Sequence, residues 1–208
     1  PGARSDRGAN RDPFRDVHRL PAVVQVIHLQ IATARDADRR QATVVGDKAS
    51  VRLCGLYLPN GNPAPGPKFD YKLAWIKRLE QRARALLADE TPFLMTGDFN
   101  IIPQAEDAAS PAAWRDDALF RFETREAWRR LLALGLTDAF RARTQGPGHY
   151  SFWDYQAGAW NRNNGIRIDH FLLSPAVADM LKDCQIDKEI RAREKPSDHV
   201  PVWVDLDF

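Results

Sequence analysis

The chain has 208 residues, of which 44% are hydrophobic and 28% are charged, and its formal net charge at pH 7 is +2. This length and composition are typical of one globular domain with a substantial core. The sequence shows no apolar run of membrane-spanning length and no signal-peptide pattern, so we expect no membrane partner. The small positive charge permits a polyanionic partner where basic residues gather on one face.

The two cysteines, Cys54 and Cys184, lie far apart and lack the spacing of a metal site. Each falls in an apolar or strand-like setting, which is typical of buried thiols. We therefore expect reduced cysteines and a cytoplasmic protein.

Hydrophobic periodicity predicts little regular structure at the start of the chain. Residues 1–20 are rich in Arg and Asp and poor in aliphatic side chains, which predicts a loop or disorder. The apolar run over residues 21–31 has the length of a strand. Residues 1–45 therefore stay unassigned, and no linker divides the rest, which we interpret as one domain over residues 46–208.

From residue 50 onward the pattern becomes regular and predicts an α/β order of elements. Thr124 and Gly135 are candidate N-cap and C-cap residues of the second helix. The expected elements are strands over residues 50–58, 93–100, 166–174, 186–192 and 200–206, and helices over residues 70–88 and 124–134.

Asp98 and Asn100 follow a short apolar run, at the point where a buried strand ends. Alternation places their side chains on one side of the strand. In open α/β architectures this edge binds ligands. A carboxylate and an amide there could hold a metal, a water or a phosphate, although the same residues also fit a strand-to-turn cap. Tyr57 and Asn60 end another predicted strand in the same way.

The acid in mid-strand at Asp169 is costly to bury unless a partner pairs with it. We favour His199 as that partner, because a carboxylate fixes the tautomer of a histidine and raises its basicity. Asp198 would then be left to reach a hard cation such as Mg²⁺. The alternative is that Asp198 caps a loop and His199 is an ordinary surface residue.

Four strings, spread over the chain from about Val51 to its end, carry a specific resemblance. They are GLYLPNGN (55–62), GDFNIIP (97–103), YSFWDYQAGAWNRNNGIRIDHFLLS (150–174) and EKPSDHVPVW (194–203). In this order they resemble the exonuclease III family, the bacterial abasic-site branch of the endonuclease/exonuclease/phosphatase superfamily. The resemblance implies a four-layer α/β sandwich of two packed mixed sheets flanked by helices, with the active site at one end.

The resemblance also implies roles for individual residues. Asp98 would activate the attacking water, and Asn100 would help to position it. His199 would contact the scissile phosphate, with Asp169 orienting its imidazole, and Tyr57 would also reach the phosphate. These roles suit phosphodiester cleavage, which needs a water nucleophile and positive charge on the phosphate oxygens.

Further residues match positions that the family uses for metal and substrate. Asp198 matches a position associated with the Mg²⁺ site, for which Mn²⁺ is an alternative ion. The apolar pocket for a sugar without a base would consist of Phe152, Trp153 and Ile166. Rotating such a sugar out of the duplex has a low free-energy cost, because no base has to be unstacked. Candidates for contacts with backbone phosphates are Arg162 and Arg167.

The chain departs from the family at its start. The family's Asn-containing motif and its Gln-Glu motif, whose Glu is the principal metal ligand, do not occur before Val51. The first glutamate of the sequence is Glu80, on a predicted helix. The resemblance therefore implies a chain that lacks the N-terminal part of the family's fold.

The expected function is that of a Mg²⁺-dependent DNA repair phosphodiesterase. It would incise double-stranded DNA 5′ to abasic sites, trim damaged 3′ ends as a 3′→5′ exonuclease, and act as a monomer. One alternative is a catalytically impaired DNA-binding fragment of the same family, because the glutamate motif is missing. Another is a phosphatase of the superfamily that acts on a phospholipid or an inositol phosphate.

Overall fold

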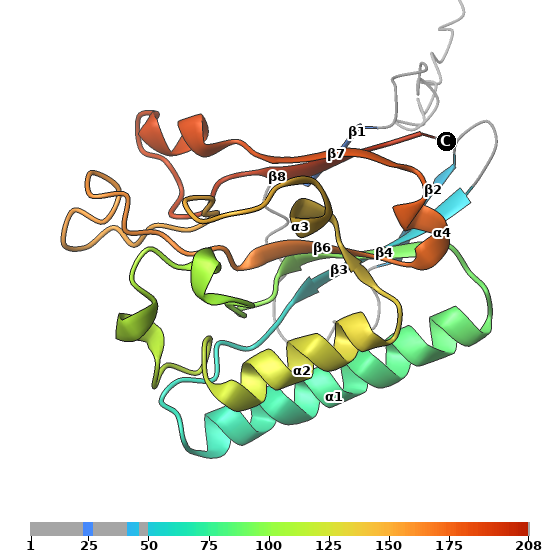
Figure 1. Ribbon diagram of the computed structural model, residues 1–208, viewed down its shortest axis with the longest axis horizontal. Helices are drawn as coiled ribbons and strands as arrows, with labels where there is room; N and C mark the ends of the chain where they lie inside the picture. The colour runs from blue at the N-terminus through green and yellow to red at the C-terminus, as the bar shows by residue number, and fades with distance from the viewer. Residues whose placement is uncertain (1–22, 27–40, 46–49, 208) are drawn as a thin grey trace, which may run out of the picture.

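The computed structural model describes residues 23–26, 41–45 and 50–207, the first two as backbone strands (Figure 1). Two β-sheets stack face to face, and a pair of long helices covers the outer face of the larger one (Figure 1). No helix that the structure describes has the length and apolar character needed to cross a membrane.

The larger sheet has five strands in the order β2-β3-β4-β6-β5. It is mixed, because β3 and β4 run parallel whereas the other neighbours are antiparallel. The smaller sheet is antiparallel, in the order β1-β8-β7. The strands are β1 (Val23–Val26), β2 (Gln41–Val45), β3 (Ser50–Tyr57), β4 (Phe93–Asp98), β5 (Thr137–Asp138), β6 (Asp169–Leu173), β7 (Leu181–Ile186) and β8 (Val202–Leu206).

The long helices α1 and α2 pack against each other, and the shorter α3 lies against β6 and β7 (Figure 1). Helix α1 begins with a proline, whose fixed φ suits the first turn. The α-helices are α1 (Pro67–Ala88), α2 (Phe122–Ala133), α3 (Ala139–Arg143) and α4 (Pro175–Ala178), and 3₁₀ helices cover Ala105–Asp107, Pro111–Trp114 and Lys188–Ala192.

Strand β4 is buried on both faces, which explains why its sequence begins with consecutive apolar residues. Phe93 and Met95 point into the core beneath the two long helices, whereas Leu94 points into the core between the sheets. Three layers are thus described, namely two sheets and one helical layer (Figure 1). The second helical layer of the expected sandwich is not among the elements that the structure describes.

The expected α/β class is confirmed, and most predicted elements lie within a few residues of the observed ones. The strand predicted over residues 186–192 is wrong. Strand β7 ends at Ile186, and the segment that follows is a 3₁₀ helix. That helix buries Arg191, whose guanidinium donates to the Trp153 carbonyl at 3.1 Å, a contact that sequence periodicity does not encode.

The start of α2 also differs from the prediction. Its N-cap residue is Arg121, whose side chain makes no capping hydrogen bond. Thr124 lies inside the helix, where its buried hydroxyl donates to the Ala118 carbonyl at 2.7 Å. At the other end the C-cap residue is Leu134 and not Gly135, which follows it with a φ of +99°, as expected of a glycine just beyond a helix.

Two strands lie within residues 1–45, which the sequence left unassigned. β1 falls inside the predicted apolar run and pairs with β8. β2 was not predicted and pairs with β3. The loop or disorder expected over residues 1–20 lies outside the described residues. Both cysteines are free, and Cys184 is buried.

Candidate active site

The register of the larger sheet places three polar residues in a row at one end. Tyr57 is paired with Asp98 across the parallel strands β3 and β4. Asp98 is in turn paired with Asp169 across the antiparallel strands β4 and β6. Directly paired residues on adjacent strands have neighbouring side chains. A phenol and two carboxylates from three strands therefore share one sheet edge.

Glycine at position 97 is required for the close approach of β3 and β4. Its φ is +137°, and a Cβ atom there would lie 2.0 Å from the Leu56 carbonyl oxygen. Beyond it the chain turns, so that Phe99 enters the apolar core beneath the helices while Asn100 folds back toward Asp98.

Asn100 holds both oxygens of the Asp98 carboxylate. Its backbone N–H donates to Asp98 Oδ1 at 2.8 Å, and its Nδ2 donates to Oδ2 at 2.9 Å. The same Nδ2 donates to the Leu58 carbonyl at 2.9 Å. Asn60 Nδ2 donates to Asn100 Oδ1 at 3.2 Å, which links the loop after β3 to this turn. The turn cap is thus present, but each carboxylate oxygen keeps a second lone pair for a ligand.

Burial raises the pKa of Asp98, and the neighbouring charge of Asp169 raises it further, to about 7. His199, the Asn100 amide and Lys72 act in the opposite direction. A carboxyl group with a pKa near neutrality exists in both protonation states at physiological pH, as a general base requires.

The structure brings His199 and Asp169 together, with Nδ1 of the histidine 2.9 Å from Oδ2 of the aspartate. Their side chains are 12% and 16% exposed. Burial lowers the pKa of His199, but the charges of Asp169, Asp98 and Asp198 outweigh it and raise the pKa to about 9. At neutral pH the imidazole is therefore a cation next to a carboxylate.

The loop that carries Asp198 and His199 is fastened to the segment around Phe152. Trp153 N donates to the Asp198 carbonyl, and Val200 N donates to the Ser151 carbonyl, both at 2.9 Å. The Phe152 ring meets the His199 ring edge-on, with centroids 5.0 Å apart. Two of the motifs recognised in the sequence thus form one unit.

The expected apolar pocket is only partly at the surface. Phe152 is half-buried beside His199, whereas Trp153 is 0% exposed and Ile166 is 2% exposed. Ile166 packs in the same core cluster as Phe152, whereas Trp153 packs in another cluster. The prediction that all three residues line one pocket is therefore corrected. The reason is that Phe152 and Ile166 form a backbone bridge, which turns the Ile166 side chain into a core cluster.

Of the two arginines predicted to contact DNA, Arg162 is exposed and Arg167 is fully buried. The Arg167 prediction is wrong, because its guanidinium is buried and bound to carboxylates inside the protein. Nε donates to Asp107 Oδ1 at 2.7 Å, and Nη2 donates to Asp138 Oδ2 at 2.8 Å. Arg141 binds the same Asp107 carboxylate, so the two cations and two anions of this cluster balance.

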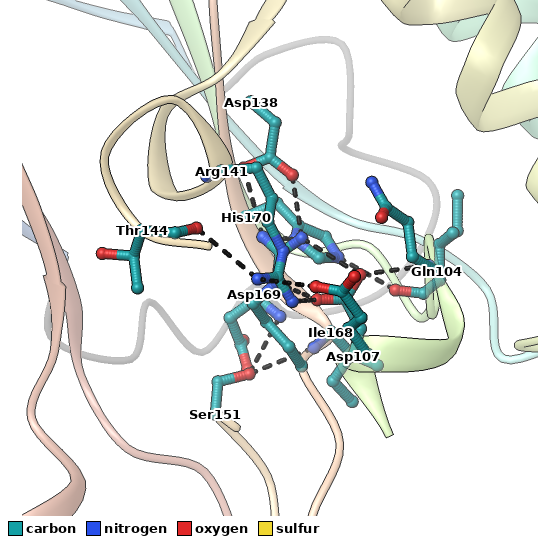
Figure 2. Close-up of polar contacts among 12 residues, drawn as sticks. Gln104, Asp107, Asp138, Arg141, Thr144, Ser151, Ile168, Asp169 and His170 are labelled. Carbon is teal, nitrogen blue, oxygen red and sulfur yellow. Dashed lines mark hydrogen bonds and ion pairs between the residues drawn. The ribbon is translucent and has the colours of Figure 1, made fainter. Parts of the chain in front are cut away.

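The cluster also contains His170, the residue after Asp169 (Figure 2). Arg167 Nη1 lies 3.0 Å from His170 Nδ1, which must therefore accept, and His170 Nε2 donates to the Ile101 carbonyl at 2.9 Å. Burial and the Arg167 charge lower the pKa of His170 to about 4, so it is neutral. The cluster thus joins the start of β6 to the turn after β4.

Sequence reasoning also missed Lys72, a fully buried lysine behind the Asp98 turn. Its Nζ donates to the carbonyls of Asn60 and Asn100. Burial lowers its pKa to about 7. The one available signal was its position within the apolar stripe of α1.

The described residues contain no group of three or more His, Cys, Asp or Glu side chains that could hold a metal ion. The first glutamate, Glu80, pairs with Arg84 and Arg130 between the long helices. Carboxylate oxygens are nevertheless present in half-buried Asp198 and in the Asp98–Asp169 row. Such carboxylate oxygens are the kind of ligand that hard divalent cations prefer.

Comparisons with known proteins agree with this arrangement. The chain is 32% identical over 180 residues to an exodeoxyribonuclease of Bacillus subtilis, covering 86% of this chain and 68% of that protein. It is 34% identical over 158 residues to exodeoxyribonuclease III of Haemophilus influenzae, covering 72% of this chain and 59% of that protein. The chain thus spans roughly three fifths to two thirds of the length of these relatives.

Among solved structures, the 3′ phosphatase NExo from Neisseria, bound to a product DNA hairpin, superposes with a TM-score of 0.75 at 38% identity, over 81% of this chain and 64% of that one. An AP endonuclease from Archaeoglobus fulgidus gives a TM-score of 0.74 at 31% identity, again over 81% and 64%. The sequence profile of one family matches residues 9–199, which begins upstream of the motifs that first indicated it. The resemblance to exonuclease III is confirmed, and the chain belongs to the Endonuclease/Exonuclease/phosphatase family.

Proposed function

We propose that this chain hydrolyses phosphodiester bonds in DNA. The observation that carries the proposal is the row of Tyr57, Asp98 and Asp169 at one sheet edge, with His199 bound to Asp169. A base of near-neutral pKa and a cation lie at the same edge, which is what attack by water on a phosphate needs.

Asp98 is the general base in this proposal. Its carboxylate accepts a proton from the attacking water, and its pKa of about 7 allows it to be ionised and yet basic at physiological pH. Asn100 fixes the orientation of the carboxylate through two hydrogen bonds. The free lone pairs of the carboxylate therefore point in one direction, which reduces the entropic cost of aligning the water.

His199 is the group that stabilises charge on the phosphate. With a pKa of about 9, it carries a proton at neutral pH, and Asp169 accepts from Nδ1. The other ring nitrogen, Nε2, also carries a hydrogen in the imidazolium, and in this proposal it donates to a phosphate oxygen. The Tyr57 hydroxyl, on a side chain that is 52% exposed, is a second donor for the same phosphate.

Asp198 is the proposed ligand of a Mg²⁺ ion, with Mn²⁺ as the alternative. A bound divalent ion would neutralise charge that develops on the phosphate oxygens.

The proposed substrate is double-stranded DNA with abasic sites or damaged 3′ ends, bound by a monomer. Relatives named for AP endonuclease, exonuclease and 3′ phosphatase activity support this choice. Phe152 offers an apolar ring next to His199, where a sugar without a base could rest. Exposed Arg162 is the candidate for a contact with a backbone phosphate.

The test uses a duplex oligonucleotide with one abasic analogue, incubated with the protein with and without Mg²⁺. We expect one nick 5′ to the analogue, none in the undamaged duplex, and a loss of roughly 10²–10⁴-fold in rate for His199→Ala. Binding of the duplex without any nick would instead identify a DNA-binding fragment. Release of phosphate from an inositol phosphate, with DNA left intact, would identify a phosphatase of different substrate class.

A further inference from the structure

Lys72 occupies a position of α1 that normally belongs to an apolar side chain. It is 0% exposed and lies on the helix face that buries Phe69 and Ile76. An ammonium ion at such a place loses its hydration, and this loss is unfavourable even after the surroundings relax. A methionine or leucine would fill the same space without this cost. A purely structural role therefore explains the position poorly.

The ammonium group bridges two loops of the candidate site. Nζ donates to the Asn60 carbonyl at 2.9 Å and to the Asn100 carbonyl at 2.6 Å. The first loop follows β3 and the second follows β4, and the Asn60 and Asn100 side chains are hydrogen-bonded to each other. When Lys72 is protonated, these hydrogen bonds come from a charged donor and are about twice as strong as neutral ones.

Gly61 makes room for this bridge. Its φ is +91°, and a Cβ atom at this position would lie 2.6 Å from Lys72 Cδ. The loop after β3 thus passes directly over the lysine stem. Lys72 is the shared anchor of the backbone on both sides of the Asn60–Asn100 contact.

We propose that Lys72 is a positioning residue of the active site, which holds the Asn100 turn so that its amide keeps the Asp98 carboxylate aligned. The proposal rests on the proposed function, because Asp98 is the base of that reaction. Lys72 contacts the Asn60 and Asn100 carbonyls, and its charge also lowers the pKa of Asp98. Its loss should therefore slow the chemical step and leave the contact surface for DNA intact.

The test compares Lys72→Met with Lys77→Met, an exposed lysine on the same helix. Circular dichroism first establishes that both variants are folded. For Lys72→Met we expect kcat for cleavage of the abasic duplex to fall roughly tenfold to a hundredfold, with KM within about twofold of the original, because small misplacements of reacting groups have effects of this size. Lys77→Met should cleave as the unchanged protein does.

A second readout does not depend on activity. In ¹⁵N NMR spectra, the side-chain amide signals of Asn60 and Asn100 should shift and exchange faster with solvent in Lys72→Met, but not in Lys77→Met. This measurement tests the positioning even where the unchanged protein cleaves no DNA, a result that would reject the proposed function alone.

Lys72→Gln, which keeps a donor but removes the charge, serves as a second variant. We expect its kcat to lie between those of the unchanged protein and Lys72→Met. A folded variant with unchanged kcat and unchanged amide signals would overturn the proposal. So would failure of both Lys72 variants to fold, because Lys72 would then be a determinant of folding.

Discussion

Replacing Asp169 with asparagine should move the whole pH profile of cleavage toward lower pH. The Asp169 charge raises the pKa of Asp98, the proposed base, and also that of His199, the proposed cation. The acid limb of the profile depends on ionisation of the base, and the alkaline limb depends on loss of the imidazolium proton. Asparagine removes the charge, so both limbs should shift in the same direction.

The size of the effect follows from the pKa of His199, which is about 9 against an ordinary value of 6.5. At pH 8 the protonated fraction would fall from about 90% to about 3% if the pKa returned to its ordinary value. Asp98 and Asp198 remain and retain part of the rise. We therefore expect a loss of roughly tenfold in rate at pH 8. At pH 6 we expect no loss or a small gain, because a larger fraction of Asp98 is ionised once its pKa falls.

The assay is single-turnover cleavage of the abasic duplex between pH 5 and 10, with an NMR titration of the His199 ring as an independent measure. Asp179→Asn, an exposed carboxylate just beyond the end of α4, is the matched control. The reasoning would be refuted if Asp169→Asn cleaved more slowly at every pH but kept the same pH optimum, and if the His199 ring titrated at an unchanged pH.

The same contact predicts a pH-dependent stability. The folded-state pKa of His199 lies above its unfolded value, so the stabilisation is complete below about pH 6.5 and is lost as the pH rises through about 9. This rise of the His199 pKa contributes at most on the order of 3 kcal/mol to the free energy of unfolding. Relief of the repulsion between Asp98 and Asp169 offsets part of it in Asp169→Asn. In urea titrations, the free energy of unfolding of Asp169→Asn should fall further below that of the unchanged protein at pH 6 than at pH 10.

Three further perturbations test other parts of the molecule. Arg167→Met should lower the free energy of unfolding by about 3–5 kcal/mol in urea titrations, because it leaves two buried carboxylates without their main partner, whereas exposed Arg162→Met should change it by less than about 0.5 kcal/mol. Gly97→Ala should cost about 3 kcal/mol or more by the same measurement, since its Cβ would meet the backbone of β3, whereas Gly146→Ala has open space and should cost only about 1 kcal/mol for its positive φ. Chelation of metal with EDTA should abolish cleavage without lowering Tm, and cleavage that persists in EDTA would contradict the assignment of a metal. Asp198→Asn should raise the Mg²⁺ concentration that gives half-maximal rate at least about tenfold.

Local sequence patterns predicted the elements of the core because their cause is local. The apolar run Phe93–Met95 and the helical stripe of α1 each follow from a repeating burial pattern. β2 was missed because its sequence has a weak period. Among the strands that the structure describes, it lies at one end of the larger sheet and pairs with β3. The strand predicted over residues 186–192 failed because apolar content alone does not separate a strand from a 3₁₀ turn.

The site divides in the same way. Motif recognition found Tyr57, Asp98, Asp169 and His199, which the sheet register and one hydrogen bond bring together. It could not tell exposed Arg162 from buried Arg167, since two arginines in one motif look alike without their partners.

The sequence by itself determined the family, the α/β class and the identity of the polar groups at the sheet edge, because these depend on residue types and their order. The tertiary structure alone decided how those groups are held. The partners of Arg167 are 60 and 29 residues away, and Lys72 reaches Asn100 across 28 residues. Such contacts depend on which segments the fold packs together, and the same packing sets the burial and neighbouring charges that move the pKa values of Asp98 and His199.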